Sequence, residues 1–473
     1  MGVIFNEAEA VWEWLMTHLI VINLLFSIII IFFQRRDPRS VWTWLFALNF
    51  IPVFGIIFYL LFGQDLKKSR MFKVKGISDR LNMPVKSQEE IIRSSDIPEE
   101  MMDPLIRDFR SLILYNLETS GAVLTTDNQV KIYTDGQAKF EGLRTALRRA
   151  SRFIHIQYYI IKNDEVFDSI VPILEDKVRE GVEVRILYDG MGGRFMPKRR
   201  WEELRRAGIL VGVFFPPILG WLNLRVNYRN HRKIVVIDGN VGFVGGFNIG
   251  REYISKDPGF GYWRDTHLRI TGEAVMSLQI RFALDWNYAT GENLFKNEAY
   301  FRTDLKKKTD VRRDKERPAW PDPELEGSQV GMQIIASGPD TREPHIRNNY
   351  LELFHKAKHH IYIQTPYFVP DDAIFSALKM AALSGVDVRL MIPCKPDHPF
   401  VYRATCSYAG ELLDYGAKVY IYTNGFLHSK GIMVDGRVCC YGTANMDIRS
   451  FELNFEVNAT IYDEAVTAEL EQA

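Results

Sequence analysis

Two long apolar runs near the amino terminus distinguish the start of the chain from the rest. Residues 15–33 pass nineteen positions without a charged side chain, and residues 41–63 pass twenty-three. At about 1.5 Å of helical rise per residue, each run spans roughly 30 Å, the thickness of the bilayer interior. The pattern predicts a transmembrane hairpin over residues 1–64, in which His18 and Asn23 are helix-contact or interfacial residues.

A cleaved signal peptide is the alternative interpretation of the first run. It is disfavoured because the first ten residues hold no Lys or Arg and because a second apolar run follows almost at once. More basic residues follow the second run than the first, so the positive-inside rule places the long carboxy-terminal part in the cytoplasm. These residues are Arg35, Arg36 and Arg39 between the runs, and Lys67, Lys68, Arg70, Lys73 and Lys75 after them.

Beyond about residue 130 the chain alternates strand and helix patterns, and the same series occurs twice. The strand pattern of residues 151–161 shares I-x-I-Q with that of residues 358–368. Alternation of this kind predicts an α/β fold with two mixed β-sheets flanked by helices. The resulting division has a connector at 65–129, a first half at 130–300, a charged linker at 301–329 and a second half at 330–473. The later strand pairs are 181–189 with 385–393, and 204–214 with 412–422.

Composition is that of a globular protein with no excess charge. The 59 basic residues balance the 59 acidic ones. Nucleic acid is bound mainly through excess Lys and Arg, so this balance argues against it as a partner. A local phosphate site remains compatible with a neutral chain.

Each half closes with the same polar pattern, H-x-K-x-x-x-x-D. The first copy has His231, Lys233 and Asp238, followed by Asn248; the second has His428, Lys430 and Asp435, followed by Asn445. His to Asn is seventeen residues in both copies. One such pattern is weak evidence, but two at the same point of a repeated series are not coincidence.

The chemistry of the pattern favours an anion over a metal ion. Residues two apart on a strand face the same side, so His231 and Lys233 project together, as do His428 and Lys430. A protonated Lys repels a cation, and no third nearby ligand is evident. Imidazole beside ammonium suits a phosphate, which His can attack or supply with a proton. The two asparagines, Asn248 and Asn445, could donate to the same oxygens.

This doubled pattern resembles the phospholipase D superfamily, over roughly residues 130–465. The resemblance implies one active site between the two halves and a two-step displacement through a phosphohistidine. It assigns His231 the role of nucleophile and His428 that of general acid and base. Lys233, Lys430, Asn248 and Asn445 match its phosphate-binding positions, and Asp238 and Asp435 match its motif acids, which are largely structural there.

Two further carboxylates are candidates to orient the histidines. Asp265 lies thirty-four residues after His231, and Glu456 lies twenty-eight after His428. A catalytic imidazole needs a partner on its second nitrogen, and the superfamily uses acids from about these positions. A solvent-facing strand acid is the alternative for either. His155 and His267 are expected to have ordinary core roles.

The hairpin narrows the resemblance to the bacterial cardiolipin synthases, together with "TPYFVPDD" and "NMDIRSFELNFEVN". That family joins two phosphatidylglycerol molecules and releases glycerol, without metal or nucleotide. The resemblance implies phosphatidylglycerol and cardiolipin as partners, a bacterial cell-membrane location and, as one arrangement, a homodimer. The alternatives are a membrane-tethered phosphodiesterase that hydrolyses phospholipids or nucleic acid, and a silent membrane scaffold.

An apolar insertion in the first half has no counterpart in the second. It covers "FFPPILGWLNLRVNY", residues 214–228. Transfer to a lipid requires that water be kept from the intermediate, so the insertion is expected to line the lipid entrance or to enter the bilayer. A buried loop is the alternative.

Overall fold

The computed structural model describes most of the chain and divides it into two compact units. One unit comprises residues 1–69 with 217–227, and the other comprises the remainder. The apolar insertion between 217 and 226, most of the charged linker and much of the connector lie outside the described residues. The described residues are 14, 17–19, 21–33, 38–62, 88–90, 92–93, 103–216, 227–301, 329–341 and 343–473.

The first unit is helical, and its second apolar run is broken. Residues 21–28 are helical and continue into η1 (Ile29–Phe33), and the second run forms two helices, α2 (Pro38–Phe50) and α3 (Pro52–Phe62). Within the described ranges, no helix has both the length and the apolar character needed to cross a membrane. The prediction of one continuous helix over 41–63 therefore differs from the structure.

Pro52 explains the break between α2 and α3. Proline has no amide hydrogen, so the carbonyl of Leu48 loses its helical partner there. The side chain of Asn23 donates to this carbonyl from the first run at 2.8 Å, in a buried position. The bend is also tight, because a Cβ on Gly55 would lie 2.2 Å from the carbonyl oxygen of Ala47. Asn23 is therefore a helix-contact residue.

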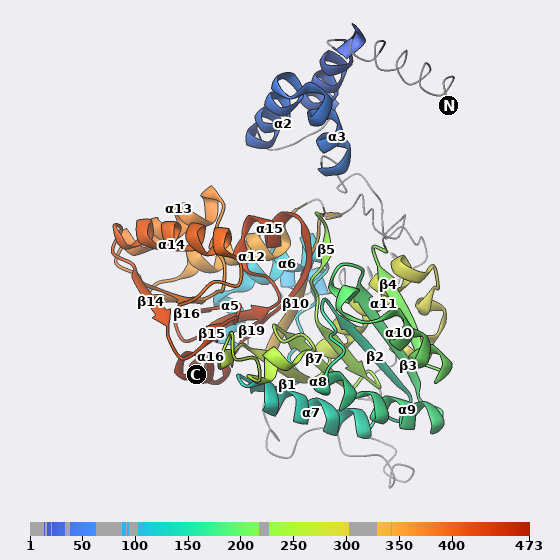
Figure 1. Cartoon of the computed structure of the whole chain (residues 1–473). Helices are drawn as coiled ribbons and strands as arrows, with labels where there is room; N and C mark the ends of the chain where they lie inside the picture. The colour runs from blue at the N-terminus through green and yellow to red at the C-terminus, as the bar shows by residue number, and fades with distance from the viewer. Residues whose placement is uncertain are drawn as a thin grey trace, which may run out of the picture. The chain divides into compact units, whose positions relative to one another are not determined.

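The second unit contains two large sheets, of seven and eight strands, and seven strands of each follow the same order (Figure 1). In the first sheet, the four strands from β1 to β6 run antiparallel to their neighbours, as do β6 and β2, whereas β2, β3 and β4 are parallel. In spatial order the strands are β1 (Asn128–Tyr133), β9 (His267–Gly272), β7 (Val241–Gly245), β6 (Ile234–Ile237), β2 (Phe153–Tyr158), β3 (Glu183–Asp189) and β4 (Leu210–Phe214).

The second sheet repeats this arrangement strand for strand. Its pairings are antiparallel up to the fifth strand and parallel beyond it. The three strand pairs predicted from the sequence occupy equivalent positions, which confirms the duplicated α/β fold. The order is β10 (Gly331–Ser337), β19 (Asn454–Tyr462), β17 (Val438–Gly442), β16 (Gly431–Val434), β11 (His360–Gln364), β13 (Asp387–Pro393) and β14 (Lys418–Tyr422).

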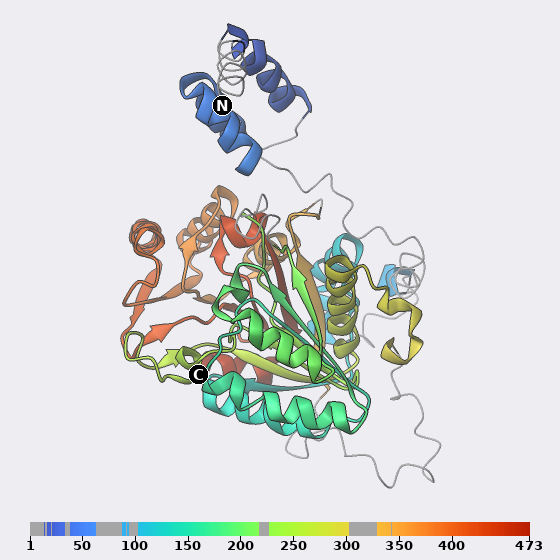
Figure 2. The same cartoon turned by 45° about the vertical axis from the view of Figure 1, so that its right-hand side comes forward.

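Helices cover both faces of the first sheet, as Figure 2 shows with α7 in teal and α11 in olive on different sides of the green strands. Alternate residues of β2 face the two layers: Ile154 joins the core beneath α7, whereas His155 stacks on Phe282 of α11 at 4.5 Å. His155 thus has the core role expected of it. The helices of this half are α7 (Gly136–Arg148), α8 (Glu165–Asp168), α9 (Val171–Arg179), α10 (Lys198–Arg206) and α11 (Ala274–Thr290).

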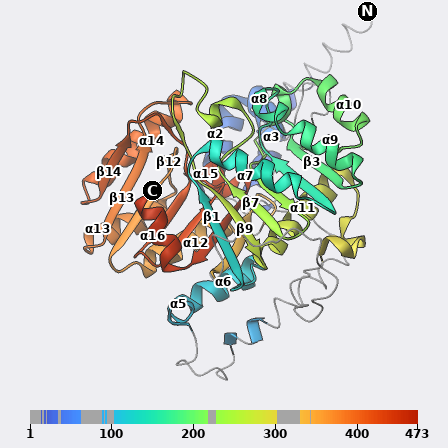
Figure 3. The same ribbon diagram turned by 90° about the horizontal axis from the view of Figure 1, so that it is seen from below.

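The core of the second half includes residues that precede the first half in sequence. Residues 103–120, within the segment expected to connect, form α5 (Pro104–Asp108) and α6 (Arg110–Ser120), and Leu112 and Ile113 pack into this core. Seen from below, the orange and red second half lies beside the green first half (Figure 3). Its helices are α12 (His345–Lys356), α13 (Asp372–Leu383), α14 (Pro399–Leu413), α15 (Ile448–Glu452) and α16 (Glu464–Gln472).

The two motif aspartates fix the starts of the central strands. Asp238 follows β6 and accepts hydrogen bonds from the backbone N–H groups of Ser151, Arg152 and Phe153 at 2.7–2.9 Å. Asp435 follows β16 and accepts from three successive N–H groups, residues 358–360, at 2.8 Å each. Both aspartates have a φ of 55°, a conformation that Asp tolerates better than most residues. They hold strand ends that would otherwise have unpaired donors.

We predict that Asp238→Ala lowers the free energy of unfolding by about 1–3 kcal/mol, because it leaves the buried N–H of Phe153 without an acceptor and removes the hydrogen bonds to Ser151 and Arg152. Asp435→Ala should act in the same direction. Chemical denaturation of the purified chain measures the change. Asp176→Ala, which removes an exposed carboxylate, is the matched control and should leave the midpoint in place. A wild-type midpoint in Asp238→Ala would contradict this structural role.

Candidate active site

The two histidine motifs meet because each half contributes a short strand to the other. β5 (Arg229–Asn230) pairs in parallel with the start of β19, and β15 (Phe426–Leu427) pairs in parallel with β8 (Trp263–Arg264). The backbone N–H of His231 then donates to the carbonyl of Phe455 at 2.9 Å, and that of His428 donates to Arg264 at 2.7 Å. Each motif histidine is thereby held on a strand of the opposite half.

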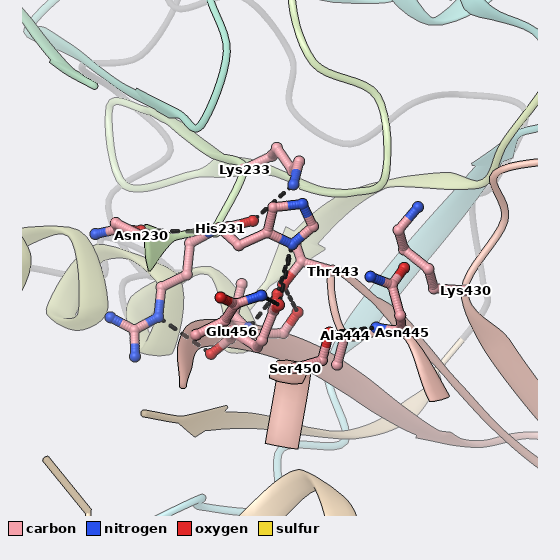
Figure 4. Close-up of polar contacts among 12 residues, drawn as sticks. Asn230, His231, Lys233, Lys430, Thr443, Ala444, Asn445, Ser450 and Glu456 are labelled. Carbon is pink, nitrogen blue, oxygen red and sulfur yellow. Dashed lines mark hydrogen bonds and ion pairs between the residues drawn. The ribbon is translucent and has the colours of Figure 1, made fainter. Parts of the chain in front are cut away.

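The side chains continue this exchange, because each imidazole takes its carboxylate from the other half. Nδ1 of His231 lies 3.0 Å from both carboxylate oxygens of Glu456 (Figure 4). Nδ1 of His428 lies 2.6 Å from Oδ2 of Asp265. A carboxylate only accepts, so Nδ1 carries the hydrogen and Nε2 keeps its lone pair. Both predicted orienting acids thus contact a motif histidine, but the crosswise pairing was not foreseen.

The two motif lysines are buried beside the histidines. Nζ of Lys233 donates to the carbonyl of His231 at 2.7 Å. Nζ of Lys430 donates to the carbonyl of His428 and lies 2.7 Å from Nδ1 of the same residue. Both lysines are almost fully shielded from solvent. The site therefore concentrates positive charge where an anion could be held.

Burial and neighbouring charge change the proton affinity of these groups. Burial, and then Lys430, lower the pKa of His428 to about 4, against the opposing effect of Asp265. Burial lowers the pKa of His231 as well, Glu456 raises it and Lys233 lowers it. Burial also lowers the pKa of Lys430 to about 8. Both imidazoles are consequently neutral at pH 7 and can act as nucleophile or base through Nε2.

The two carboxylates stay ionised despite complete burial. Burial alone would raise the pKa of Asp265, but Lys430 and His428 bring it below its ordinary value. Burial likewise opposes ionisation of Glu456, while His231 and Lys233 lower its pKa. Both acids can therefore stabilise a positively charged imidazole during a reaction.

The two motif asparagines are not equivalent in the structure. Asn248 is committed to the protein: its Oδ1 accepts from the N–H of Ile160 at 3.1 Å and its Nδ2 donates to Tyr253 at 3.0 Å. The buried Oδ1 of Asn445 has no hydrogen-bond partner among the described residues, and Figure 4 places this side chain beside Lys430. Asn445 thus has a buried side-chain oxygen without a partner in the described part of the chain, whereas both polar atoms of the Asn248 amide are paired.

The motif aspartates lie away from the histidines. Asp238 is seven residues from His231, and an extended strand places them roughly 23 Å apart. Asp435 has the same position in the second half. Their hydrogen bonds to strand ends indicate a structural role, as the resemblance implies for the motif acids. His267, expected in the core, is fully buried there.

Arg232, between the motif His and Lys, locks the two halves together behind the site. It points away from His231, and both oxygens of the Asp285 carboxylate accept from its Nη1, at 2.6 and 2.7 Å. Its Nε donates to the carbonyl of Glu456, and its Nη2 donates to that of Ser337. The sequence analysis missed this residue. The signal available was an arginine between His231 and Lys233, which in an extended segment faces the side opposite to both.

Asp189 and Tyr159 also border the site and were missed. Oδ2 of Asp189 accepts from the backbone N–H of Asn230 at 2.7 Å, and burial raises the pKa of this carboxyl to about 6. The ring of Tyr159 meets that of His231 edge-on at 5.2 Å. Asp189 ends β3 and Tyr159 follows β2, and functional side chains of α/β sheets gather at these strand ends.

No group of three or more His, Cys, Asp or Glu side chains suited to a metal ion occurs in the described part of the chain. Each motif histidine instead contacts one carboxylate and lies beside one lysine. The expectation that the reaction needs no cofactor stays a prediction.

Comparison with known proteins agrees with the duplicated site. A family model described as "Cardiolipin synthase, PLD-like domain" matches residues 143–260 and 350–473, and one described as "Phospholipase_D-nuclease N-terminal" matches residues 21–64. A cardiolipin synthase of Listeria innocua is 44% identical over 97% of this chain and 91% of its own length. One from Staphylococcus aureus is 48% identical over 96% of this chain and 88% of its own.

A solved structure shows the same fold at low sequence identity. The phosphatidylserine synthase of Haemophilus influenzae is 16% identical and covers 76% of this chain and 90% of its own, with a TM-score of 0.56. At this identity the likeness concerns the fold alone.

We predict that Glu456→Gln lowers the pKa of His231 further and leaves that of His428 in place, because Glu456 is the carboxylate that raises the former. Asp265→Asn should lower the pKa of His428 alone. NMR titration of chains labelled at the histidine rings measures both values. A shift of His428 in Glu456→Gln, with His231 unchanged, would show pairing within each half and contradict the crosswise arrangement.

Proposed function

The chain belongs to the cardiolipin synthase family of the phospholipase D superfamily, and from this membership we infer how its site carries out phosphatidyl transfer. The enzyme is a phosphatidyltransferase that joins two phosphatidylglycerol molecules into cardiolipin and releases glycerol. The observation that carries the proposed mechanism is the pair of imidazoles, each oriented by a buried carboxylate of the other half.

In the first step, we propose that Nε2 of His231 attacks the phosphorus of one phosphatidylglycerol. The bond from phosphorus to the glycerol oxygen breaks, and protonated His428 gives its proton to that oxygen. The phosphodiester anion supports this role, because a nearby negative charge raises the pKa of an imidazole. Glu456 stabilises the positive charge that develops on His231, and Lys233, Lys430 and Asn445 hold the phosphate oxygens.

In the second step, the roles of the two histidines reverse. Neutral His428 takes the proton of a headgroup hydroxyl on the second phosphatidylglycerol, and the resulting oxygen attacks phosphorus. The P–N bond to His231 breaks and cardiolipin leaves. The energy of the original phosphodiester is kept in the covalent intermediate, so no nucleotide is consumed. One phosphodiester bond replaces another, so the overall reaction is reversible.

The exposed apolar side chains of the first unit support a membrane role. The enzyme family acts at the membrane, and we propose that residues 1–64 embed in the bacterial cell membrane as a hairpin, with the catalytic unit in the cytoplasm. The described surface of the first unit is unusually apolar. Large apolar side chains exposed by half or more include Trp14, Val21, Leu24, Leu25, Trp42, Phe46, Phe50 and Phe54. Patches of this kind mark contact with lipid or protein.

The active-site assignment predicts that His231→Asn and His428→Asn each lower cardiolipin formation by at least about a thousandfold, as expected when one member of a catalytic unit is removed. Labelled phosphatidylglycerol and lipid mass spectrometry give the rate. Wild-type enzyme quenched with denaturant at neutral pH should carry a phosphatidyl group on the His231 peptide, because the P–N bond of a phosphohistidine hydrolyses in acid. His359→Asn, at an exposed position, is the control. Free phosphatidic acid in place of cardiolipin would indicate the phosphodiesterase instead.

The membrane assignment predicts that the full-length chain stays in the membrane pellet after alkaline carbonate washing. Leu24→Lys combined with Phe54→Lys should release a measurable fraction, because a charge within the bilayer interior costs about 2.5–3.5 kcal/mol per residue. Phe400→Lys, which alters an 89% exposed side chain of the other unit, is the matched control. Equal retention of the double variant and the control would contradict embedding of this surface. A homodimer stays a prediction.

A further inference from the structure

Trp263 has a buried hydrogen-bond donor that the protein leaves unused. Its side chain is 4% exposed, and its indole Nε1 has no hydrogen-bond partner in the described part of the chain. An indole nitrogen donates and cannot accept, and a buried tryptophan usually finds an acceptor for it. An unpaired buried donor is unfavourable, which points to an acceptor that arrives with the substrate.

The packing around Trp263 places this indole beside His428. The backbone of Trp263 pairs with that of Phe426, two residues before His428, where β8 meets β15. The centroid of its ring lies 5.0 Å from that of the His428 imidazole and 4.9 Å from that of Phe426. The rings of Tyr253 and Phe260 pack edge-on against it at 4.8 and 5.1 Å. These contacts fix the indole next to the imidazole.

The equivalent position of the second half has a different role. Asn454 precedes Glu456 by two residues, as Trp263 precedes Asp265, and both positions pair with a short exchanged strand. Nδ2 of Asn454 donates to Oε1 of Glu456 at 3.1 Å. In the first half, the backbone N–H of Thr266 donates to Oδ1 of Asp265 at 2.7 Å. Asp265 therefore receives a hydrogen bond of this kind without Trp263, whose N–H is left unpaired among the described residues.

The proposed mechanism brings the glycerol headgroup to this place. His231 attacks phosphorus from one side, and the leaving oxygen departs roughly in line on the other side, where His428 gives it a proton. The headgroup therefore lies beside His428, both when it leaves and when the second headgroup attacks. In both cases the carbon next to the reacting CH₂–O group carries a secondary hydroxyl, whose oxygen can accept a hydrogen bond.

We propose that Trp263 forms a headgroup subsite, in which its indole N–H donates to the secondary hydroxyl of the glycerol headgroup. This assignment rests on the proposed function and deepens it. One donor serves both steps, because the departing glycerol and the attacking headgroup carry the same hydroxyl next to the reacting group. An ethanolamine headgroup has no such hydroxyl and leaves the indole unpaired, so Trp263 makes the site selective for glycerol headgroups.

Competition between two soluble alcohols isolates this hydrogen bond. Labelled glycerol and 1,3-propanediol are added together to the enzyme in phosphatidylglycerol vesicles, and both react with the same phosphohistidine. The P–N bond breaks, a phosphodiester to the alcohol forms, and the alcohol proton passes to His428. 1,3-Propanediol keeps both primary hydroxyls and lacks the secondary one. The ratio of the two lipid products measures the preference and is independent of the amount of folded enzyme.

We expect the wild-type chain to prefer glycerol by roughly tenfold or more, as when an analogue leaves a buried donor unpaired. Trp263→Phe keeps an aromatic ring without the N–H and should remove most of this preference. Trp201→Phe alters another buried tryptophan, stacked on Tyr188 at 4.2 Å, and is the matched control that should keep the wild-type ratio. An unchanged ratio in Trp263→Phe, or a wild-type chain without preference, would overturn the subsite.

A second measurement uses the wild-type chain alone and does not depend on the folding of a variant. In NMR spectra of the chain with isotopically labelled indole nitrogens, one indole N–H resonance should shift on addition of glycerol and not of 1,3-propanediol. The absence of such a shift would overturn the subsite and leave the proposed function in place. A wild-type chain that forms neither cardiolipin nor the exchange products would instead contradict the proposed function, and the subsite with it.

Discussion

The crosswise bond between each imidazole and a carboxylate of the other half is the constraint on which the rest of the second unit depends. It requires β5 and β15 to leave their own sheets, so the halves cannot be separated without breaking both pairs. It also requires complete burial of Asp265 and Glu456, which is tolerated only because cations surround them. The repeated sheets serve to bring four side chains to one place from two directions.

The surrounding polar network shows how the two halves stay together around these buried charges. Arg232 joins α11 of the first half to β19 and β10 of the second. The equivalent residue of the second motif, Ser429, makes a hydroxyl–hydroxyl hydrogen bond with Thr266 at 2.7 Å. Removing one partner of a buried ion pair costs about 3–5 kcal/mol. The duplication is therefore exact in strand order and unequal in chemistry, as the two asparagines also show.

Local patterns made most of the fold and the reactive groups predictable. Strand alternation and the repeated spacing identified the equivalent strands and placed His231 with Lys233, because these depend on a few neighbouring residues. The partner of each histidine could not be predicted, since His428 meets an acid 163 residues earlier and the match depends on how strands cross between sheets. The apolar pattern of the second run did not predict the break between α2 and α3, although Pro52 was a signal for it, and the compensating hydrogen bond from Asn23 is a tertiary contact.

The exchanged strands also delay completion of the site until late in the synthesis of the chain. His231 and Glu456 are 225 residues apart. At the usual 5–20 residues per second, the ribosome needs roughly 10–45 s to supply the second after the first. Throughout that interval His231 has no carboxylate to orient it. A chain interrupted by a stalled ribosome consequently lacks one member of each crosswise pair.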